Sequence, residues 1–240
     1  MCFNVASNKS KKELEKKFKA VFEDAVYDPY YSVSGFVHPR LPVIASDQPH
    51  TIQLNRWGLI PFWVKSEEQA KELSTQTLNA RAESIFEKPS FRHSAGKKKC
   101  CVLVNGFYEW HTEGKTKTPF FIYRKDHEPF ALGGLWDEWA NPETGEIIRT
   151  FTILTVPASP MLAEIHNSKL RMPLILDHGR EQEWLETADK THTAAMCRPF
   201  HDELLQAHQI SRLINGRHGN PNVPEVQEPV NGNGQQSSLF

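Results

Sequence analysis

The sequence has almost no net charge, few cysteines and no long apolar run. Lys and Arg number 28 and Asp and Glu number 29, so the formal net charge is −1 and no overall charge predicts a nucleic-acid partner. No apolar stretch approaches the roughly 18 residues that a membrane span requires. The N-terminus also lacks the basic and apolar regions of a secretory signal. We therefore expect a cytoplasmic protein that does not associate with membranes.

The four cysteines do not have the spacing of a disulfide framework or of a metal site. Cys100 and Cys101 are adjacent in a segment expected to be a strand, where neighbouring side chains point to opposite faces. The sequence has neither a Cys-x-x-Cys pair nor a histidine cluster with ligand spacing, so no zinc site is predicted. We expect a reduced protein that uses no metal and no cofactor.

The hydrophobic pattern predicts one α+β domain with a mostly antiparallel, barrel-like β-sheet and a few flanking helices. Ser10 and Glu13 form a capping-box pattern at the start of a helix over residues 11–26, and Ser66 with Gln69 starts another. Ser159 and Pro160 predict a short helix through Ile165. A further helix is expected over 181–187, and strands over 41–45, 51–59, 101–109, 119–124, 130–136, 149–156, 171–176 and 208–214.

The C-terminal end has little to bury, because Asn, Gly, Pro, Gln and Ser dominate after Gly216. We therefore predict a domain over residues 1–216 and a flexible tail over 217–240. The last five residues, QSSLF, are similar to a short Gln-x-x-Leu-Phe peptide that binds bacterial sliding clamps. In that interpretation Leu239 and Phe240 fill an apolar pocket and Gln236 supplies an orienting hydrogen bond. A chance match in a polar tail is the alternative.

Cys2 follows the initiator methionine directly. Removal of Met1 would leave a free α-amine beside a thiol. Such an amine has a reference pKa of about 7.7 to 8.0, so part of it is neutral at cytoplasmic pH and can attack an aldehyde. The thiol can then add to the resulting Schiff base and close a thiazolidine ring. The alternative is a small buried residue at the start of a strand.

Several short segments occur in order behind Met1 and Cys2. The sequence resembles the SRAP family (SOS response-associated peptidase, also called abasic-site processing proteins) from residue 1 to about residue 214. The segments that carry the resemblance are NARAE at 79–83, GFYEW at 106–110, RMP at 171–173, WGLIPFW at 57–63 and GLW at 134–136.

The resemblance implies that Cys2 is the covalent nucleophile and that Asn79 and Glu109 flank it. An amide at Asn79 can bond the amine or a sugar hydroxyl without favouring the protonated amine, and Glu109 can shuttle protons. The resemblance also implies a histidine acid that opens the sugar, for which His166 is the candidate. Without the motifs, Asn79 would be interpreted as a turn residue, Glu109 as a surface charge and His166 as structural.

Two departures from the family pattern affect these assignments. His166 stands five residues before Arg171, where the family has its histidine two residues before that arginine. Either the intervening loop bulges to deliver the imidazole, or its role is altered. Phe3 and Asn4 stand where Gly-Arg often follows the cysteine, which removes one basic contact.

DNA binding requires cations for phosphates and flat side chains for bases. We expect phosphate contacts from Arg81 and Arg171, and from a lysine run that could equally be a solvated loop: Lys97, Lys98 and Lys99. Trp57 and Trp63 are candidates for stacking on bases, although at least one of them should be buried in the core.

The leading prediction is a monomeric protein that captures abasic sites in single-stranded DNA as a thiazolidine. One alternative is a thiol peptidase with Cys2 as nucleophile, acting either on other peptide bonds or on its own N-terminus alone. Another is a single-stranded DNA binding module without catalysis, which leaves Cys2 and Glu109 unused.

Overall fold

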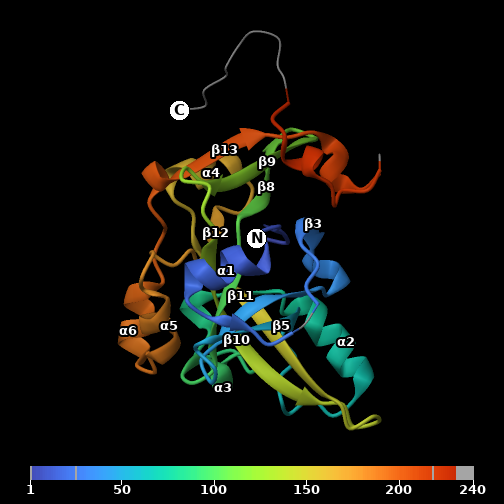
Figure 1. Ribbon diagram of the computed structural model, residues 1–240, viewed down its shortest axis with the longest axis vertical. Helices are drawn as coiled ribbons and strands as arrows, with labels where there is room; N and C mark the ends of the chain where they lie inside the picture. Colours follow the sequence, from blue (N-terminus) through green and yellow to red (C-terminus); the bar gives the residue numbers. More distant parts are fainter. Residues whose placement is uncertain (1, 25, 218, 231–240) are drawn as a thin grey trace.

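A closed barrel of strands forms the centre of the computed structural model, which describes residues 2–24, 26–217 and 219–230 (Figure 1). The barrel strands, in order, are β5 (Thr51–Trp57), β4 (Arg40–Ala45), β7 (Lys99–Val104), β10 (Phe130–Ala140) and β11 (Ile147–Pro157). Each neighbouring pair is antiparallel except β11 and β5, whose parallel pairing closes the barrel. The predicted α+β fold with a mostly antiparallel, barrel-like sheet is confirmed.

Strand β11 also pairs with strands outside the barrel. β6 (Asn79–Arg81) runs parallel to it, and β12 (Arg171–Pro173) runs antiparallel to it. Thr155 of β11 lies opposite both Arg81 and Pro173. Two of the recognised sequence segments are therefore held in register by one strand. β2 (Val21–Phe22) runs parallel to β5.

A second sheet, wholly antiparallel among the described residues, carries the N-terminus. Its order is β13 (Leu205–Gln209), β9 (Thr116–Arg124), β8 (Gly106–Glu113), β1 (Asn4–Ser7) and β3 (Tyr30–Ser34). β1 lies between β8 and β3, with Asn4 opposite both Tyr108 and Ser34. At the start of β8, a Cβ on Gly106 would lie 2.3 Å from the Phe121 ring, so a side chain there has no room.

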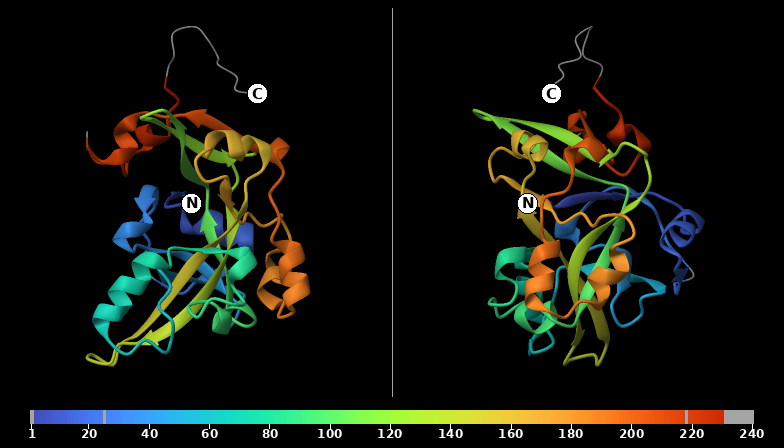
Figure 2. Two further views of the ribbon diagram at one scale, coloured as in Figure 1. Left: turned by 180° about the vertical axis from the view of Figure 1, so that it is seen from behind. Right: turned by 90° about the vertical axis from the view of Figure 1, so that its left-hand side faces the viewer.

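Helices lie against the outside of these sheets, and Figure 2 shows α5 and α6 side by side on one flank. The predicted caps are present: Ser10 and Glu13 make both capping-box bonds, and Ser66 accepts from the Gln69 N–H. In the described part of the chain, none of the helices has the length and apolarity needed to span a bilayer. The α-helices are α1 (Lys11–Phe18), α2 (Glu67–Gln76), α3 (Arg92–Ala95), α4 (Pro160–Ile165), α5 (Glu181–Glu186) and α6 (Lys190–Met196). The 3-10 helices are η1 (Gly35–Val37), η2 (Ala82–Ser84), η3 (Asp202–Leu204), η4 (Arg212–Asn215) and η5 (Pro224–Gln227).

Several predicted boundaries are wrong, and three of them have an identifiable cause. The first helix ends at Phe18 and not at residue 26, because Lys19 turns left-handed (φ 52°) and the next apolar pair joins β5 as β2. The strand predicted over 101–109 breaks at Asn105, where the chain passes from the barrel to the second sheet. The late strand predicted over 208–214 lies at Leu205–Gln209, and η4 follows it.

The packed part of the chain extends beyond the boundary predicted at residue 216. Val226 is fully buried in η5, and the Gln227 side chain donates to the Tyr31 carbonyl oxygen at 3.0 Å. Ile210 also forms a bridge with Pro229. The tail expected from residue 217 is therefore wrong for this stretch. Gln236, Leu239 and Phe240 lie outside the described residues.

Candidate active site

Asn79 links β6 to the N-terminus of the chain. Its Nδ2 donates a hydrogen bond of 2.9 Å to the Cys2 carbonyl oxygen. The Asn79 side chain is buried, and its Oδ1 has no hydrogen-bond partner among the described residues. The fold therefore places a spare amide acceptor in the immediate surroundings of Cys2, on a strand fixed by its pairing with β11.

The Cys2 thiol is fully buried. Its Sγ lies 3.8 Å from the Asn4 carbonyl oxygen. Burial raises the pKa of this thiol well above its ordinary value, and the charge of Glu109 raises it further. Cys2 is therefore a protonated thiol in this environment and not a thiolate.

Glu109 and His166 form a buried pair from two different elements. Glu109 is on β8, and His166 follows the last residue of α4. The distance from His166 Nδ1 to Glu109 Oε2 is 3.6 Å. Burial raises the pKa of Glu109 to about 7, so this carboxyl can hold or release a proton near neutral pH.

The protonation of His166 follows from its hydrogen bond to the backbone. Its Nδ1 lies 2.7 Å from the Arg171 carbonyl oxygen. A carbonyl only accepts, so Nδ1 carries the hydrogen and Nε2 holds the lone pair of the neutral ring. Burial lowers the pKa of His166, an effect that the Arg171 carbonyl opposes. The imidazole is thus neutral at neutral pH.

The loop between His166 and Arg171 folds back on itself, which compensates for the unusual spacing in the sequence. The Leu170 N–H donates to the His166 carbonyl oxygen at 3.0 Å, and Leu170 takes a left-handed conformation (φ 53°). His166 therefore reaches Glu109 although it stands five positions before Arg171. The loop bulges, as one of the two interpretations of the sequence expects.

Comparison with known proteins identifies the family. The family model for SOS response associated peptidase (SRAP) matches residues 1–217. The chain belongs to the SRAP family. The abasic site processing protein YoqW of Bacillus subtilis is 35% identical over 205 residues, covering 84% of this chain and 87% of that protein. The chicken (Gallus gallus) abasic site processing protein HMCES is 33% identical over 195 residues, covering 73% of this chain and 56% of that protein.

Solved structures agree with this assignment. A crystal structure of a protein from Bacteroides thetaiotaomicron superimposes with a TM-score of 0.89 at 36% sequence identity, covering 96% of this chain and all of that one. A second, from Bordetella bronchiseptica, has a TM-score of 0.76 at 28% identity and covers 88% of this chain. Barrel and second sheet therefore form one SRAP fold.

Arg171 of this SRAP chain forms an ion pair with a carboxylate of the same chain. Its guanidinium makes a two-point ion pair with Glu83 at 2.9 and 3.0 Å, and it also bonds Thr155 Oγ1 at 3.2 Å. Only 12% of the Arg171 side chain is exposed. These contacts join β12, β11 and η2, whereas Arg81 on β6 is exposed. Arg81 is thus the stronger phosphate candidate of the two.

We expect Arg81→Ala to weaken binding of single-stranded DNA. The slope of log affinity against log salt concentration should become shallower by the amount that corresponds to about one phosphate contact. Arg171→Ala should instead lower the thermal stability, because it removes the ion pair with Glu83 and the hydrogen bond to Thr155 Oγ1. Binding titrations at several salt concentrations, together with melting curves, measure both effects. An unchanged salt slope in Arg81→Ala removes Arg81 from the phosphate path.

Two predicted DNA contacts are wrong because the side chains are buried. Trp57 is fully buried, stacks on Phe151 and donates from Nε1 to the Leu78 carbonyl oxygen, so its ring cannot reach a base. Lys99 is also buried, and its Nζ bonds Thr193 Oγ1 at 2.6 Å. Burial lowers the pKa of Lys99 to about 8. The expectation that at least one of the two tryptophans is buried is confirmed.

The other predicted DNA contacts lie at the surface to different degrees. Lys97 is exposed, whereas Lys98 is held 2.7 Å from Asp137. Trp63 is 37% exposed and can present part of its ring. Phe36 is not among the residues that the sequence predicts for this site. It is 55% exposed, and the centroid of its ring lies 5.0 Å from that of Phe3, the residue next to Cys2. No sequence signal separates such an exposed apolar residue from a core one.

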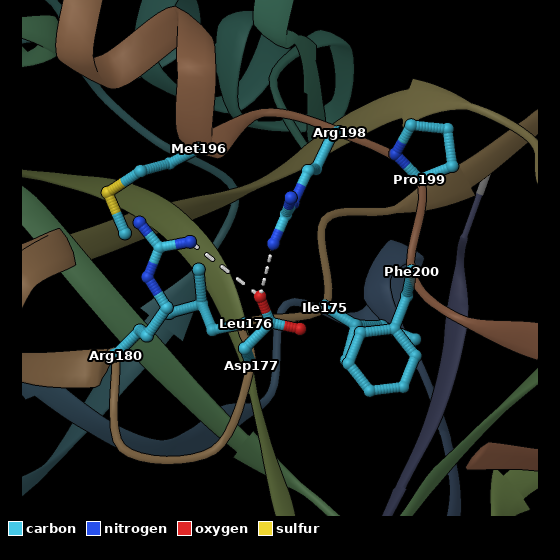
Figure 3. A pocket seen from close by; sticks show the side chains of 8 residues that line it. All are labelled: Ile175, Leu176, Asp177, Arg180, Met196, Arg198, Pro199 and Phe200. Atoms are coloured by element: carbon cyan, nitrogen blue, oxygen red, sulfur yellow. Dashed lines mark hydrogen bonds and ion pairs between the residues drawn. The ribbon is translucent and has the colours of Figure 1, made fainter.

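The small cavity in Figure 3 is a separate feature, with a volume of about 10 Å³. Asp177 lies in it between two arginines, at 2.9 Å from Arg198 and 3.7 Å from Arg180. This volume holds about one water molecule, so the cavity cannot hold a substrate. The remaining lining comes from Ile175, Leu176, Met196, Pro199 and Phe200.

Proposed function

We propose that this SRAP protein captures abasic sites in single-stranded DNA by a covalent bond through Cys2, after removal of Met1. The observation that carries the proposal is the convergence of Asn79 and Glu109 on the N-terminus, with His166 beside Glu109. Relatives that share a third of the sequence bear the name abasic site processing protein. Three of the segments that match the family supply groups at this site: NARAE contributes Asn79, GFYEW contributes Glu109, and RMP contributes the Arg171 carbonyl oxygen that His166 bonds.

The reaction follows from the groups in the site. The neutral α-amine of Cys2 adds to the C1′ aldehyde of the opened sugar, and Glu109 takes the proton that the nitrogen loses. Glu109 passes that proton to the oxygen of the carbinolamine, then takes the second proton of the nitrogen and gives it to the hydroxyl group, which leaves as water as the Schiff base forms. The Cys2 thiol then adds across the C=N bond: sulfur bonds to carbon, and the thiol hydrogen ends on nitrogen. The product is a thiazolidine.

Asn79 and His166 support these steps without changing the balance of atoms. The free Oδ1 of Asn79 can accept a hydrogen bond from the amine and orient it. Neutral His166 offers its Nε2 lone pair, so Glu109 is the better acid for opening the sugar and His166 the better acceptor. This assignment differs from the one that the family resemblance implies.

The peptidase alternative requires a thiolate nucleophile. The buried Cys2 thiol beside Glu109 has a raised pKa, which works against a thiolate. A Schiff base mechanism does not have this difficulty, because the amine attacks first. The thiol adds only afterwards, in a step within one molecule.

The test is a denaturing gel of the protein incubated with single-stranded DNA that carries one abasic site. Wild type and Cys197→Ala, a control at a half-buried cysteine, should give a covalent band, and Cys2→Ala should give none. Cys2→Ser should form a complex only when borohydride reduces the Schiff base. A covalent band in Cys2→Ala, or none in the wild type, contradicts the proposal.

A further inference from the structure

The residue after His166 is fastened to the strand that carries Glu109. Asn167 Oδ1 accepts from the Thr112 N–H at 3.0 Å, and Asn167 Nδ2 donates to the Thr112 carbonyl oxygen at 2.9 Å. Thr112 lies on β8, three residues beyond Glu109. The Asn167 side chain therefore pairs with β8 as the backbone of a neighbouring strand would.

A second contact fastens the same segment from the other side of His166. His111 Nδ1 donates to the Glu164 carbonyl oxygen at 2.7 Å. Residues before and after His166 are thus both tied to β8. The distance between the imidazole and Glu109 is set by these contacts together with the Arg171 carbonyl.

The Asn167 contacts contribute little to overall stability. Asn167 is exposed, and its bonds to Thr112 replace bonds to water, so their net contribution to folding is small. Their effect on position is larger, because a catalytic group displaced by about 1 Å can slow a reaction roughly 100-fold. An exposed side chain that makes two backbone bonds beside a buried histidine points to positioning.

We propose that Asn167 is a positioning residue, which holds His166 against Glu109 by pairing with Thr112 of β8. The inference deepens the proposed function and rests on it for its kinetic consequence. The bulged loop between His166 and Arg171 makes such an anchor necessary, since that loop has no strand pairing until Arg171 begins β12. Asn167 fixes the loop at its first residue.

Single-turnover crosslinking at saturating DNA tests the inference. Asn167→Ala should lower the rate roughly 10- to 100-fold with DNA affinity unchanged. The matched control is Ser168→Ala, an exposed neighbour for which the rate should stay within about twofold. Asn167→Ala should cause no further loss in a His166→Ala background, because it acts through the imidazole. Equal rates in the two single variants, or a full additional loss in His166→Ala, overturn the inference.

A measurement without DNA separates this inference from the proposed function. In NMR titrations of the free protein, Asn167→Ala should shift the His166 midpoint upward as the imidazole moves toward water, and Ser168→Ala should leave it unchanged. If Asn167→Ala shifts the His166 titration midpoint but the wild-type protein forms no crosslink, the positioning role is supported and the proposed function is refuted. An unshifted midpoint would refute the positioning role, whatever the crosslinking result.

Discussion

A protein that keeps Met1 is expected to form no covalent complex with abasic DNA, while its affinity for an undamaged strand stays the same. With Met1 attached, the Cys2 nitrogen is part of a peptide bond and has no lone pair available for an aldehyde. The phosphate contact that we propose, Arg81, lies on β6 and does not depend on the amine. The expected result is a complete loss of the covalent band.

The cleanest form of this experiment uses one preparation before and after cleavage. A protein with an N-terminal extension that a protease removes directly before Cys2 should gain crosslinking on cleavage. Mass spectrometry establishes which N-terminus is present, and a fluorescence titration with undamaged DNA is the control for binding. Robust crosslinking by a protein that retains Met1 would refute amine attack.

Glu109→Gln is expected to slow crosslinking by roughly 10²- to 10⁴-fold, which is the usual contribution of a general acid–base group. Glutamine keeps the volume and can still donate or accept hydrogen bonds, but it cannot take a proton from the amine and return it to the leaving water. DNA affinity should change little. Equal losses in rate and in affinity would indicate a structural Glu109.

The same substitution has an expected effect on stability that serves as a control for folding. Burial raises the pKa of Glu109 from an ordinary 4.5 to about 7, so the folded state disfavours its ionised form. In the wild type, Glu109 makes its full contribution to the free energy of unfolding below about pH 4.5, where it is protonated in both states. That contribution is lost as pH rises through 7. Glu109→Gln should therefore have the same melting temperature as the wild type at pH 5 and a higher melting temperature than the wild type at pH 8. A variant that melts lower at both pH values is misfolded.

The local signals in the sequence predicted local structure correctly, and failures came from contacts distant in the chain. The capping box at Ser10 predicts where α1 begins. The sequence does not predict where α1 ends, because Val21 and Phe22 fit a helical face as well as they fit a strand. Only the pairing of β2 with Thr51 and Ile52 decides between the two.

The burial of individual side chains was the least predictable property. Trp57 and Trp63 lie in one short motif, yet the first is in the core and the second is partly exposed. The buried Lys99 ammonium donates a hydrogen bond to Thr193, which lies 94 residues further along the chain. Neighbouring residues carry no information about such a partner. The motif residues Cys2 and Asn79 were found because the family resemblance identifies them, and their hydrogen bond confirms only that they are neighbours.

The pairing of β12 with β11 affects where the chain length can change in this protein family. Arg171 is placed by its pairing with Pro157, independently of the length of the loop that precedes it. The loop from His166 can therefore gain or lose residues while β12 keeps its register, provided that an anchor returns the imidazole to β8. We therefore expect the scaffold to tolerate insertions at this point, and grafting loops of different lengths between His166 and Arg171 is a route to altered reaction rates without redesign of the barrel.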